Sequence, residues 1–189
     1  MALRLSILPP HCTFVLQETL DVYIINNSSM FLVLLDASGA FDLVQYVKLF
    51  WLLRKRGLRP CTCSFLAVMY TTQSLKVNWH GYSSNPLSTS NGVKQGGLLS
   101  PILFCVHMDE LISRLKQSGV GCFIRDIYLG SLSYVDDLCL LTPTRSATQI
   151  MLSICEKFGK EYNVMFNSQS AISYSITPMI NILTCPNYI

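Results

Sequence analysis

The chain has 189 residues, a formal net charge of +3 and only 13% charged residues, while half of its residues are hydrophobic. This size predicts one domain with a sizeable core, and the excess of apolar residues predicts surfaces that pack on neighbouring parts. The sequence lacks a membrane-spanning run, a signal peptide, and zinc or disulfide spacing among its eight cysteines, so we expect an intracellular protein, nuclear or cytoplasmic, with no membrane partner.

Apolar residues recur at helical spacing in some segments and alternate or run uninterrupted in others. In chain order these patterns predict a helix over 12–26, a strand over 31–35, helices over 42–56 and 62–72, a strand over 74–79, a helix over 102–116, short strands near 122–124, a hairpin over 131–141, a helix over 147–162 and a strand over 164–166. Helices and strands that alternate without the glycine fingerprint of a parallel crossover favour an α+β fold, an antiparallel sheet backed by helices.

Two adjacent carboxylates, Asp136 and Asp137, lie between the apolar stretches 131–135 and 138–141. Asp tolerates turn geometry and disfavours strand interiors, so the pattern predicts a hairpin whose turn carries both acids. Neighbouring carboxylates repel each other unless a cation lies between them, and hard oxygen ligands suit Mg²⁺ and phosphate chemistry. The alternative is an ordinary solvated turn.

A third acid, Asp36, follows the apolar residues 31–35 and precedes the small residues 37–40. The position predicts a carboxylate at the exit of a buried strand, where it could share a metal pair with the acids of the hairpin. Asp is also a favoured N-cap, so the alternative is that Asp36 caps the next helix.

Residues 91–101 (NGVKQGGLLSP) form a glycine-rich segment in front of a predicted helix. Paired glycines let a backbone approach a ligand closely, and Gln95 offers an amide to the sugar or base of a nucleotide. Ser100 and Pro101 predict an N-cap and a first helical turn. The alternative is an ordinary loop before a helix.

These three segments together resemble reverse transcriptases, most closely those of non-LTR (LINE-like) retrotransposons. Residues 35–42 (LDASGAFD) resemble the family's LDASKAFD motif, residues 91–101 resemble NGVRQGGxLSP, and residues 134–137 (YVDD) resemble the Y(A/V)DD box. The order and spacing also match, and the resemblance covers about residues 11–170. It implies a palm with a ferredoxin- or RRM-like antiparallel sheet, a divergent tail over 171–189, and fingers and thumb that are largely missing.

The resemblance also implies roles for individual residues in two-metal transfer of a deoxynucleotidyl group from a dNTP to a primer 3′-hydroxyl. The acids Asp36 and Asp136 would hold Mg²⁺, with Mn²⁺ as an alternative, and Asp137 would support them. RNA template, DNA primer and dNTP are the implied partners, together with the missing fingers, thumb or other domains of the element. Around the acids, Phe41 would exclude a 2′-hydroxyl, Gln95, Gly96 and Gly97 would line the nucleotide pocket, and Tyr134 would lie beside the primer end. Phe41 and Tyr134 each have a plainer alternative as a buried aromatic residue.

A basic cluster, residues 54–56 with Arg59, suits nucleic-acid phosphates, although cations are also favoured at a helix C-terminus, where this cluster is predicted to lie. His11, His80 and His107 have no metal-ligand spacing and are expected to be structural.

The sequence also departs from the family pattern. Gly39 replaces the usual Lys, and Gln169 stands where family members have a Lys of the FNxKKS motif that protonates pyrophosphate. With this Lys and the triphosphate and primer grips missing, we expect the chain to be inactive alone. The competing hypothesis is a decayed or repurposed non-catalytic module that binds nucleic acid or protein. An RNA-directed RNA polymerase is disfavoured by the bulky Phe41.

Overall fold

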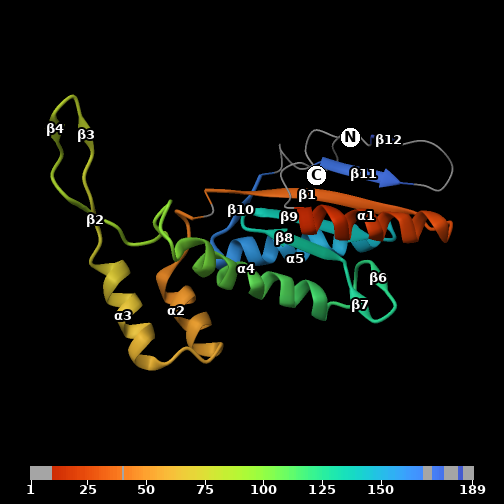
Figure 1. The fold of residues 1–189 in the computed structure, drawn as a ribbon, viewed down its shortest axis with the longest axis horizontal. Helices are drawn as coiled ribbons and strands as arrows, with labels where there is room; N and C mark the ends of the chain where they lie inside the picture. The colour runs from red at the N-terminus through yellow and green to blue at the C-terminus, as the bar shows by residue number, and fades with distance from the viewer. Residues whose placement is uncertain (1–9, 40, 168–171, 177–182, 185–189) are drawn as a thin grey trace. The chain divides into compact units, whose positions relative to one another are not determined.

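The computed structural model describes residues 10–39, 41–167, 172–176 and 183–184 (Figure 1). The chain divides into two compact units. Unit 1 comprises Met1–Ser38 and Met108–Ile189, and unit 2 comprises Gly39–His107. In the part of the chain that the structure describes, no helix has the length and apolar character that a membrane crossing requires.

Over its described residues, unit 1 is built on an antiparallel sheet of six strands in which β1 is central. β1 pairs with β9 on one side and with β11 on the other, and β10 joins the far end of β1. The bounds are Met30–Ser38 for β1, Ser131–Tyr134 for β8, Asp137–Thr142 for β9, Met165–Phe166 for β10, Ile172–Ile176 for β11 and Leu183–Thr184 for β12, and the order is β12-β11-β1-β9-β8. The antiparallel α+β architecture predicted from the sequence is confirmed.

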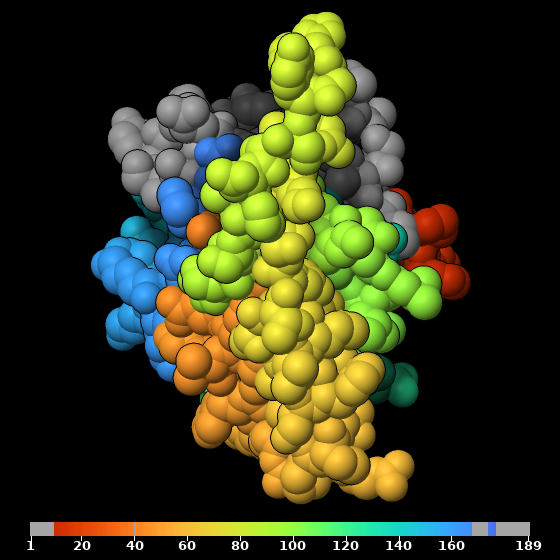
Figure 2. Space-filling model, turned by 90° about the vertical axis from the view of Figure 1, so that its left-hand side faces the viewer, coloured from red at the N-terminus to blue at the C-terminus, as the bar shows by residue number. Residues whose placement is uncertain are grey.

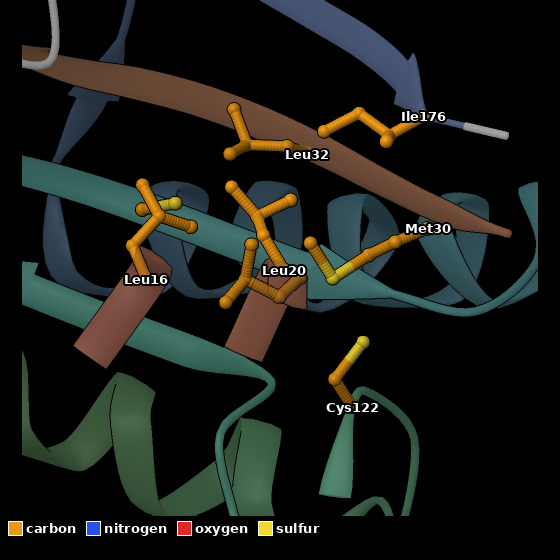
Figure 3. Packing of buried hydrophobic residues seen from close by; sticks show 8 residues of the cluster. Leu16, Leu20, Met30, Leu32, Cys122 and Ile176 are labelled. Carbon is orange, nitrogen blue, oxygen red and sulfur yellow. The ribbon is translucent and has the colours of Figure 1, made fainter. Parts of the chain in front are cut away.

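One face of the sheet packs on α1 (Pro10–Ile25) through a cluster of buried residues. Leu32 on β1 lies directly opposite Leu141 on β9, and Leu16 and Leu20 of α1 belong to the same cluster (Figure 3). Residues of a strand alternate between faces, so this face takes every second residue of β1, beginning with Met30. Burial of these side chains is the main force that holds α1 on the sheet.

The other face packs on α5 (Arg145–Tyr162), which lies behind the strands in Figure 1. The Thr144 side chain caps the helix by accepting a hydrogen bond from the Ala147 N–H, 3.2 Å away. A buried hydrogen bond of 2.6 Å joins the hydroxyls of Thr142 on β9 and Thr148 on α5. The helix ends at Asn163, which adopts the left-handed conformation common at this position.

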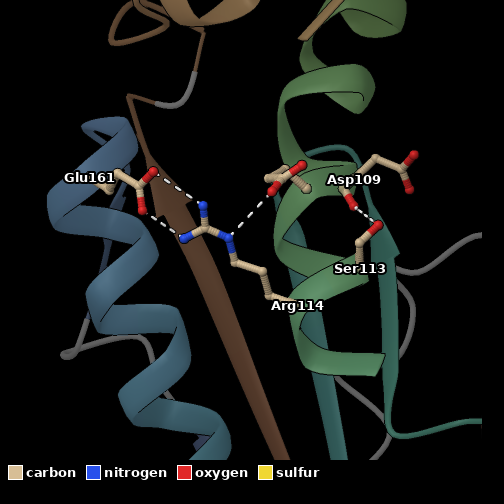
Figure 4. A network of polar contacts seen from close by, with 5 residues as sticks. Asp109, Ser113, Arg114 and Glu161 are labelled. Atoms are coloured by element: carbon tan, nitrogen blue, oxygen red, sulfur yellow. Dashed lines mark hydrogen bonds and ion pairs between the residues drawn. The ribbon is translucent and has the colours of Figure 1, made fainter. Parts of the chain in front are cut away.

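The C-terminal part of α4 (Ser100–Gln117) is joined to α5 by the side chain of Arg114 (Figure 4). Its guanidinium donates to both carboxylate oxygens of Glu161, at 2.7 and 3.1 Å, and to Glu110 at 3.5 Å. It also lies over the rings of Phe158 and Tyr162. The hydrogen bonds to Glu161 raise the pKa of Arg114. Between α4 and β8, a small hairpin pairs β6 (Phe123–Ile124) with β7 (Ile127–Tyr128).

Unit 2 contains α2 (Tyr46–Lys55) and α3 (Pro60–Thr71), then a two-stranded ribbon, and it ends within α4. In the ribbon, β2 (Ser74–Leu75) pairs with β5 (Leu87–Ser88), and β3 (Asn78–Trp79) pairs with β4 (Tyr82–Ser83). His80 and Gly81 both have positive φ in the turn at its tip, as a tight hairpin turn requires. The ribbon is the narrow yellow-green column at the top of Figure 2.

Several local predictions need correction. The strand expected over 74–79 is split into β2 and β3, and all of its residues are exposed. The second helix begins at Tyr46 rather than at Asp42, because residues 41–43 form a turn. Val47 of this helix is 84% exposed and lies outside its buried face. The buried face of α2 consists of Tyr46, Leu49, Leu52 and Leu53.

The predicted lack of a zinc site or disulfide leads to an expectation about thiol reactivity. Burial raises the pKa of Cys139 and of Cys155 to about 12, whereas Cys61 is exposed. The thiolate is the reactive form, so brief alkylation near pH 8 is expected to label Cys61 and to spare Cys139 and Cys155 until the protein is unfolded. Peptide mass mapping before and after addition of urea measures this. Equal labelling of Cys61 and Cys139 in the folded protein would contradict the buried positions.

Candidate active site

The candidate acidic residues, which are far apart in the sequence, meet in the central sheet of unit 1. Asp36 on β1 and Asp137, the first residue of β9, are direct partners in the antiparallel ladder. Directly opposed residues of an antiparallel pair point to the same face, so the two carboxylates project side by side. Both residues are half-buried. They continue the row of Leu32 and Leu141 at the other end of the same face.

Asp36 does not cap a helix. β1 continues past it to Ser38, and Ala37 and Ser38 pair with β10. The strand was expected to end at Asp36 because small residues follow. Pairing with a strand from much later in the chain extends it, and this could not be inferred from local residues.

The remaining candidate acid, Asp136, lies in the hairpin turn. Tyr134 pairs with Asp137, so the turn consists of Val135 and Asp136, and only one of the two acids lies in it. Val135 has φ +52°, a conformation that a β-branched residue rarely adopts and that is often found at functional sites. Tyr134 is 47% exposed, which makes the alternative of a buried hairpin tyrosine wrong.

Backbone hydrogen bonds fix the acids from both sides. The Ala37 N–H donates to the carbonyl of Asp136 at 3.1 Å, which ties the turn to β1. The Asn167 N–H donates to the carbonyl of Asp36 at 2.8 Å, just after β10. Neither bond was predicted from the sequence, since a backbone hydrogen bond leaves no residue pattern. Gln169, two residues later, is outside the described residues.

Among the described residues, no three His, Cys, Asp or Glu side chains are gathered closely enough to hold a metal ion by themselves. Mg²⁺ does not require such a cage in phosphate chemistry, because one or two carboxylates, waters and substrate phosphates usually complete its shell. The opposed Asp36 and Asp137, with Asp136 adjacent, fit an ion of this kind.

The glycine-rich segment lies in unit 2, where it is attached to the end of the first acidic motif. The Gly92 N–H donates to the carbonyl of Val44 at 2.9 Å, and the Val93 N–H donates to the carbonyl of Phe41 at 2.7 Å. Gly92 has φ +90°, and a Cβ there would lie 2.9 Å from the carbonyl oxygen of Asp42. Both the conformation and the space therefore require glycine at this position.

The following glycines shape the approach to α4. Gly96 has φ +75°, and a Cβ on Gly97 would lie 2.7 Å from the Ser100 hydroxyl. That hydroxyl is buried and donates to the carbonyl of Lys94 at 2.5 Å, so Ser100 fastens the loop instead of capping the helix as predicted. The loop is therefore held at residues 92–93 and again at Lys94, with Gln95 immediately after the second anchor.

The two remaining candidate side chains of unit 2 are both engaged. The half-buried ring of Phe41 stacks on the fully buried ring of Phe104, with centroids 5.0 Å apart. The Gln95 amide nitrogen donates to both carboxylate oxygens of Asp42, at 3.2 and 3.1 Å. Asp42 was not among the predicted site residues. It is the last residue of the LDASGAFD segment and the single acid in residues 39–107, which is the signal that could have identified it.

The predicted site residues thus form two groups. Asp36, Tyr134, Asp136 and Asp137 come together in unit 1, and Phe41, Gln95, Gly96 and Gly97 belong to unit 2.

Comparison with known proteins gives consistent results. The model of the reverse transcriptase (RNA-dependent DNA polymerase) family matches residues 6–170. A Pol polyprotein of the type-2 retrotransposable element R2DM of Drosophila melanogaster is 29% identical over 148 residues, which are 78% of this chain and 14% of that protein. A Pol polyprotein of the type-1 element R2 of Popillia japonica is 28% identical over 171 residues, or 87% of this chain and 24% of that protein. The chain thus spans a small part of these relatives.

Among solved structures, apo telomerase of Candida tropicalis truncated from its C-terminal domain has a similar fold, with a TM-score of 0.68 and 12% sequence identity. The similarity covers 92% of this chain and 39% of the telomerase chain. A second telomerase structure from the same organism, in complex with a fragment of telomeric RNA, has a TM-score of 0.63 and 12% identity over 84% of this chain and 29% of that one.

Proposed function

The chain belongs to the reverse transcriptase family, and from that premise we propose that it carries the palm of a retroelement enzyme that copies RNA into DNA. The proposed reaction transfers a deoxynucleotidyl group from a dNTP to a primer 3′-hydroxyl. The hydroxyl oxygen bonds to the α-phosphorus, and the bond from that phosphorus to pyrophosphate breaks. The observation that carries the proposal is the direct opposition of Asp36 and Asp137 beside Asp136 in the turn.

The acids Asp36 and Asp136 would hold Mg²⁺ or Mn²⁺, with Asp137 supporting them. The ions, when bound, supply activation of the primer hydroxyl and stabilise charge on the phosphates. The protein itself orients the acidic side chains. The hydrogen bonds from Ala37 and Asn167 hold the backbone of the acids, so little reorganisation is needed when substrate binds.

The residues of unit 2 would select the nucleotide. Phe41 would exclude a 2′-hydroxyl, and its stacking on Phe104 supports this role, because a steric gate must not move aside. Gln95, Gly96 and Gly97 would approach the sugar, base and template, where the positive φ of Gly96 lets the backbone turn tightly. Tyr134, half-exposed beside the turn, would lie next to the primer end.

The charge distribution supports a nucleic-acid partner. Unit 2 contains seven Lys and Arg residues and one acid, a formal charge of +6, although the whole chain carries only +3. A continuous stretch of 66 residues, 43–108, has no Asp or Glu. Such a surface attracts phosphate backbones. The cations are Lys48, Arg54, Lys55, Arg56, Arg59, Lys76 and Lys94.

Primer–template binding tests the proposal against the non-catalytic alternative. We expect an RNA–DNA primer–template to be bound more tightly when Mg²⁺ and the matching dNTP are added, with a smaller effect of the matching NTP. Primer extension by the chain alone is expected to be absent, since the chain spans only 14% and 24% of the two retroelement relatives compared above. A nucleic-acid affinity that does not change when Mg²⁺ and dNTP are added would favour the non-catalytic module. Robust extension of the primer would contradict the expected inactivity.

The basic cluster leads to a separate prediction about salt dependence. Arg54, Arg56 and Arg59 are all exposed, and Arg54 also donates to the Leu58 carbonyl and so stabilises the end of α2. Replacing both by Gln is expected to lower the slope of log affinity against log salt for single-stranded RNA by about 0.7 for each phosphate that is no longer neutralised. Filter binding at several salt concentrations measures it. The matched control replaces the exposed Arg125 and Arg145 of unit 1, and equal slopes for both double variants would contradict the assignment.

A further inference from the structure

We propose that Asp42 is a positioning residue that holds the Gln95 amide in the orientation in which it meets the nucleotide. The inference rests on the proposed function and adds to it a residue outside the predicted site. Its basis is the hydrogen bonding between the two side chains: the amide nitrogen of Gln95 lies 3.2 and 3.1 Å from the two carboxylate oxygens of Asp42.

The chemistry of the pair fixes which end of the amide faces the acid. An ionised carboxylate can only accept hydrogen bonds, so Nε2 and not Oε1 of Gln95 must face Asp42. Because the amide is planar, Oε1 is then directed away from the acid. It is thereby presented as an acceptor for a nucleotide hydroxyl or base N–H. Hydrogen bonds to a charged group are stronger than neutral ones, so this orientation is favoured even on a surface.

The backbones on both sides of the pair are already fixed. Phe41, next to Asp42, is held by its ring stacking on Phe104 and by the bond from Val93 to its carbonyl. On the other side, Lys94 is held by the Ser100 hydroxyl and by the Gly97 N–H, which donates to the same carbonyl at 3.0 Å. The main remaining freedom of Gln95 is its side chain, and the hydrogen bonds to Asp42 restrict it.

The charge of unit 2 sets Asp42 apart from its surroundings. Asp42 is the single acid among seven Lys and Arg residues, yet its described side-chain partner is the neutral amide of Gln95. An acid is therefore placed next to the gate candidate Phe41, where it can orient the amide. The hydrogen bonding between Asp42 and Gln95 thus couples Phe41 and Gln95, the two residues proposed to contact the sugar of the nucleotide.

The test compares Asp42→Ala, Asp42→Asn and Gln95→Ala in the full chain. Asp42→Ala is expected to weaken Mg²⁺-dependent dNTP binding to the primer–template complex about tenfold, as loss of one hydrogen bond to a charged group predicts. Asp42→Asn is expected to retain most of the affinity, since its amide oxygen still accepts from Gln95. The double variant Asp42→Ala/Gln95→Ala is expected to be no weaker than Gln95→Ala, because the two residues act through one interaction.

A second measurement does not depend on nucleotide binding. In a ¹⁵N–¹H spectrum, the side-chain amide of Gln95 is expected to move to the position of a free glutamine in Asp42→Ala and to stay shifted in Asp42→Asn. Asp126→Ala, an exposed acid in the β6–β7 turn, is the control and should change neither measurement. An unchanged Gln95 signal in Asp42→Ala, or additive losses in the double variant, would overturn the positioning role. Failure of the parent chain to bind dNTP would instead overturn the proposed function. The NMR signal of the Gln95 amide would still test whether Asp42 and Gln95 are hydrogen-bonded.

Discussion

Replacing Asp36 by asparagine is expected to weaken Mg²⁺-dependent binding of dNTP by about a hundredfold or more. The reason is that Asn keeps the shape of the side chain but removes one of two opposed negative charges. Changes to residues that merely support metal ligands already cost about 10- to 100-fold, so loss of a ligand itself should cost at least as much. Anisotropy of a labelled dNTP, titrated with Mg²⁺ in the presence of primer–template, measures the effect.

The matched control for this variant is Asp21→Asn, which removes an exposed acid of α1 in the same unit. Its affinity for dNTP should equal that of the parent chain. If Asp36→Asn and Asp21→Asn behave alike, the carboxylate of Asp36 does not take part in metal-dependent nucleotide binding.

Replacing Leu141 by alanine is expected to lower the free energy of unfolding of unit 1 by about 3 kcal/mol. Leu141 is fully buried, lies opposite Leu32 and belongs to the cluster beneath α1. Truncating a buried Leu removes its transfer free energy and leaves a cavity, which together cost about 2–5 kcal/mol. Hydrogen exchange of the amides of β1 and β9 measures the loss in this unit specifically.

The control for the core variant is Ile150→Ala on α5, whose side chain is 48% exposed. Its effect should stay within about 0.5 kcal/mol, the usual range for surface positions. A small effect of Leu141→Ala together with normal protection of β9 would mean that the apolar row behind the acids is not closely packed.

The features that could be predicted from the sequence are those set by neighbouring residues. The acid hairpin follows from apolar runs on both sides of two Asp residues. Helix α5 follows from the helical spacing of apolar residues that are buried in the structure, such as Met151, Cys155 and Phe158. In both segments the local pattern and the final packing agree. The same holds for α1, which was predicted over 12–26 and extends over Pro10–Ile25.

The features that could not be predicted depend on interactions between distant segments. The register that places Asp36 opposite Asp137 is set by the whole β1–β9 ladder, and the extension of β1 to Ser38 depends on β10. The late start of α2 has a similar cause, because carbonyls of Phe41 and Val44 accept hydrogen bonds from the glycine-rich segment. The helical spacing of apolar residues does not show that a distant segment will occupy these backbone carbonyls.

The most direct test of a metal site at Asp36, Asp136 and Asp137 is a calorimetric titration of Mg²⁺ into the chain with dNTP and primer–template present. Asp136→Asn is compared with Asp126→Asn, which changes an acid in the turn between β6 and β7. Binding heat is expected for the parent chain and for Asp126→Asn, and its loss is expected in Asp136→Asn. Equal heats in all three proteins would contradict a metal site at these acids.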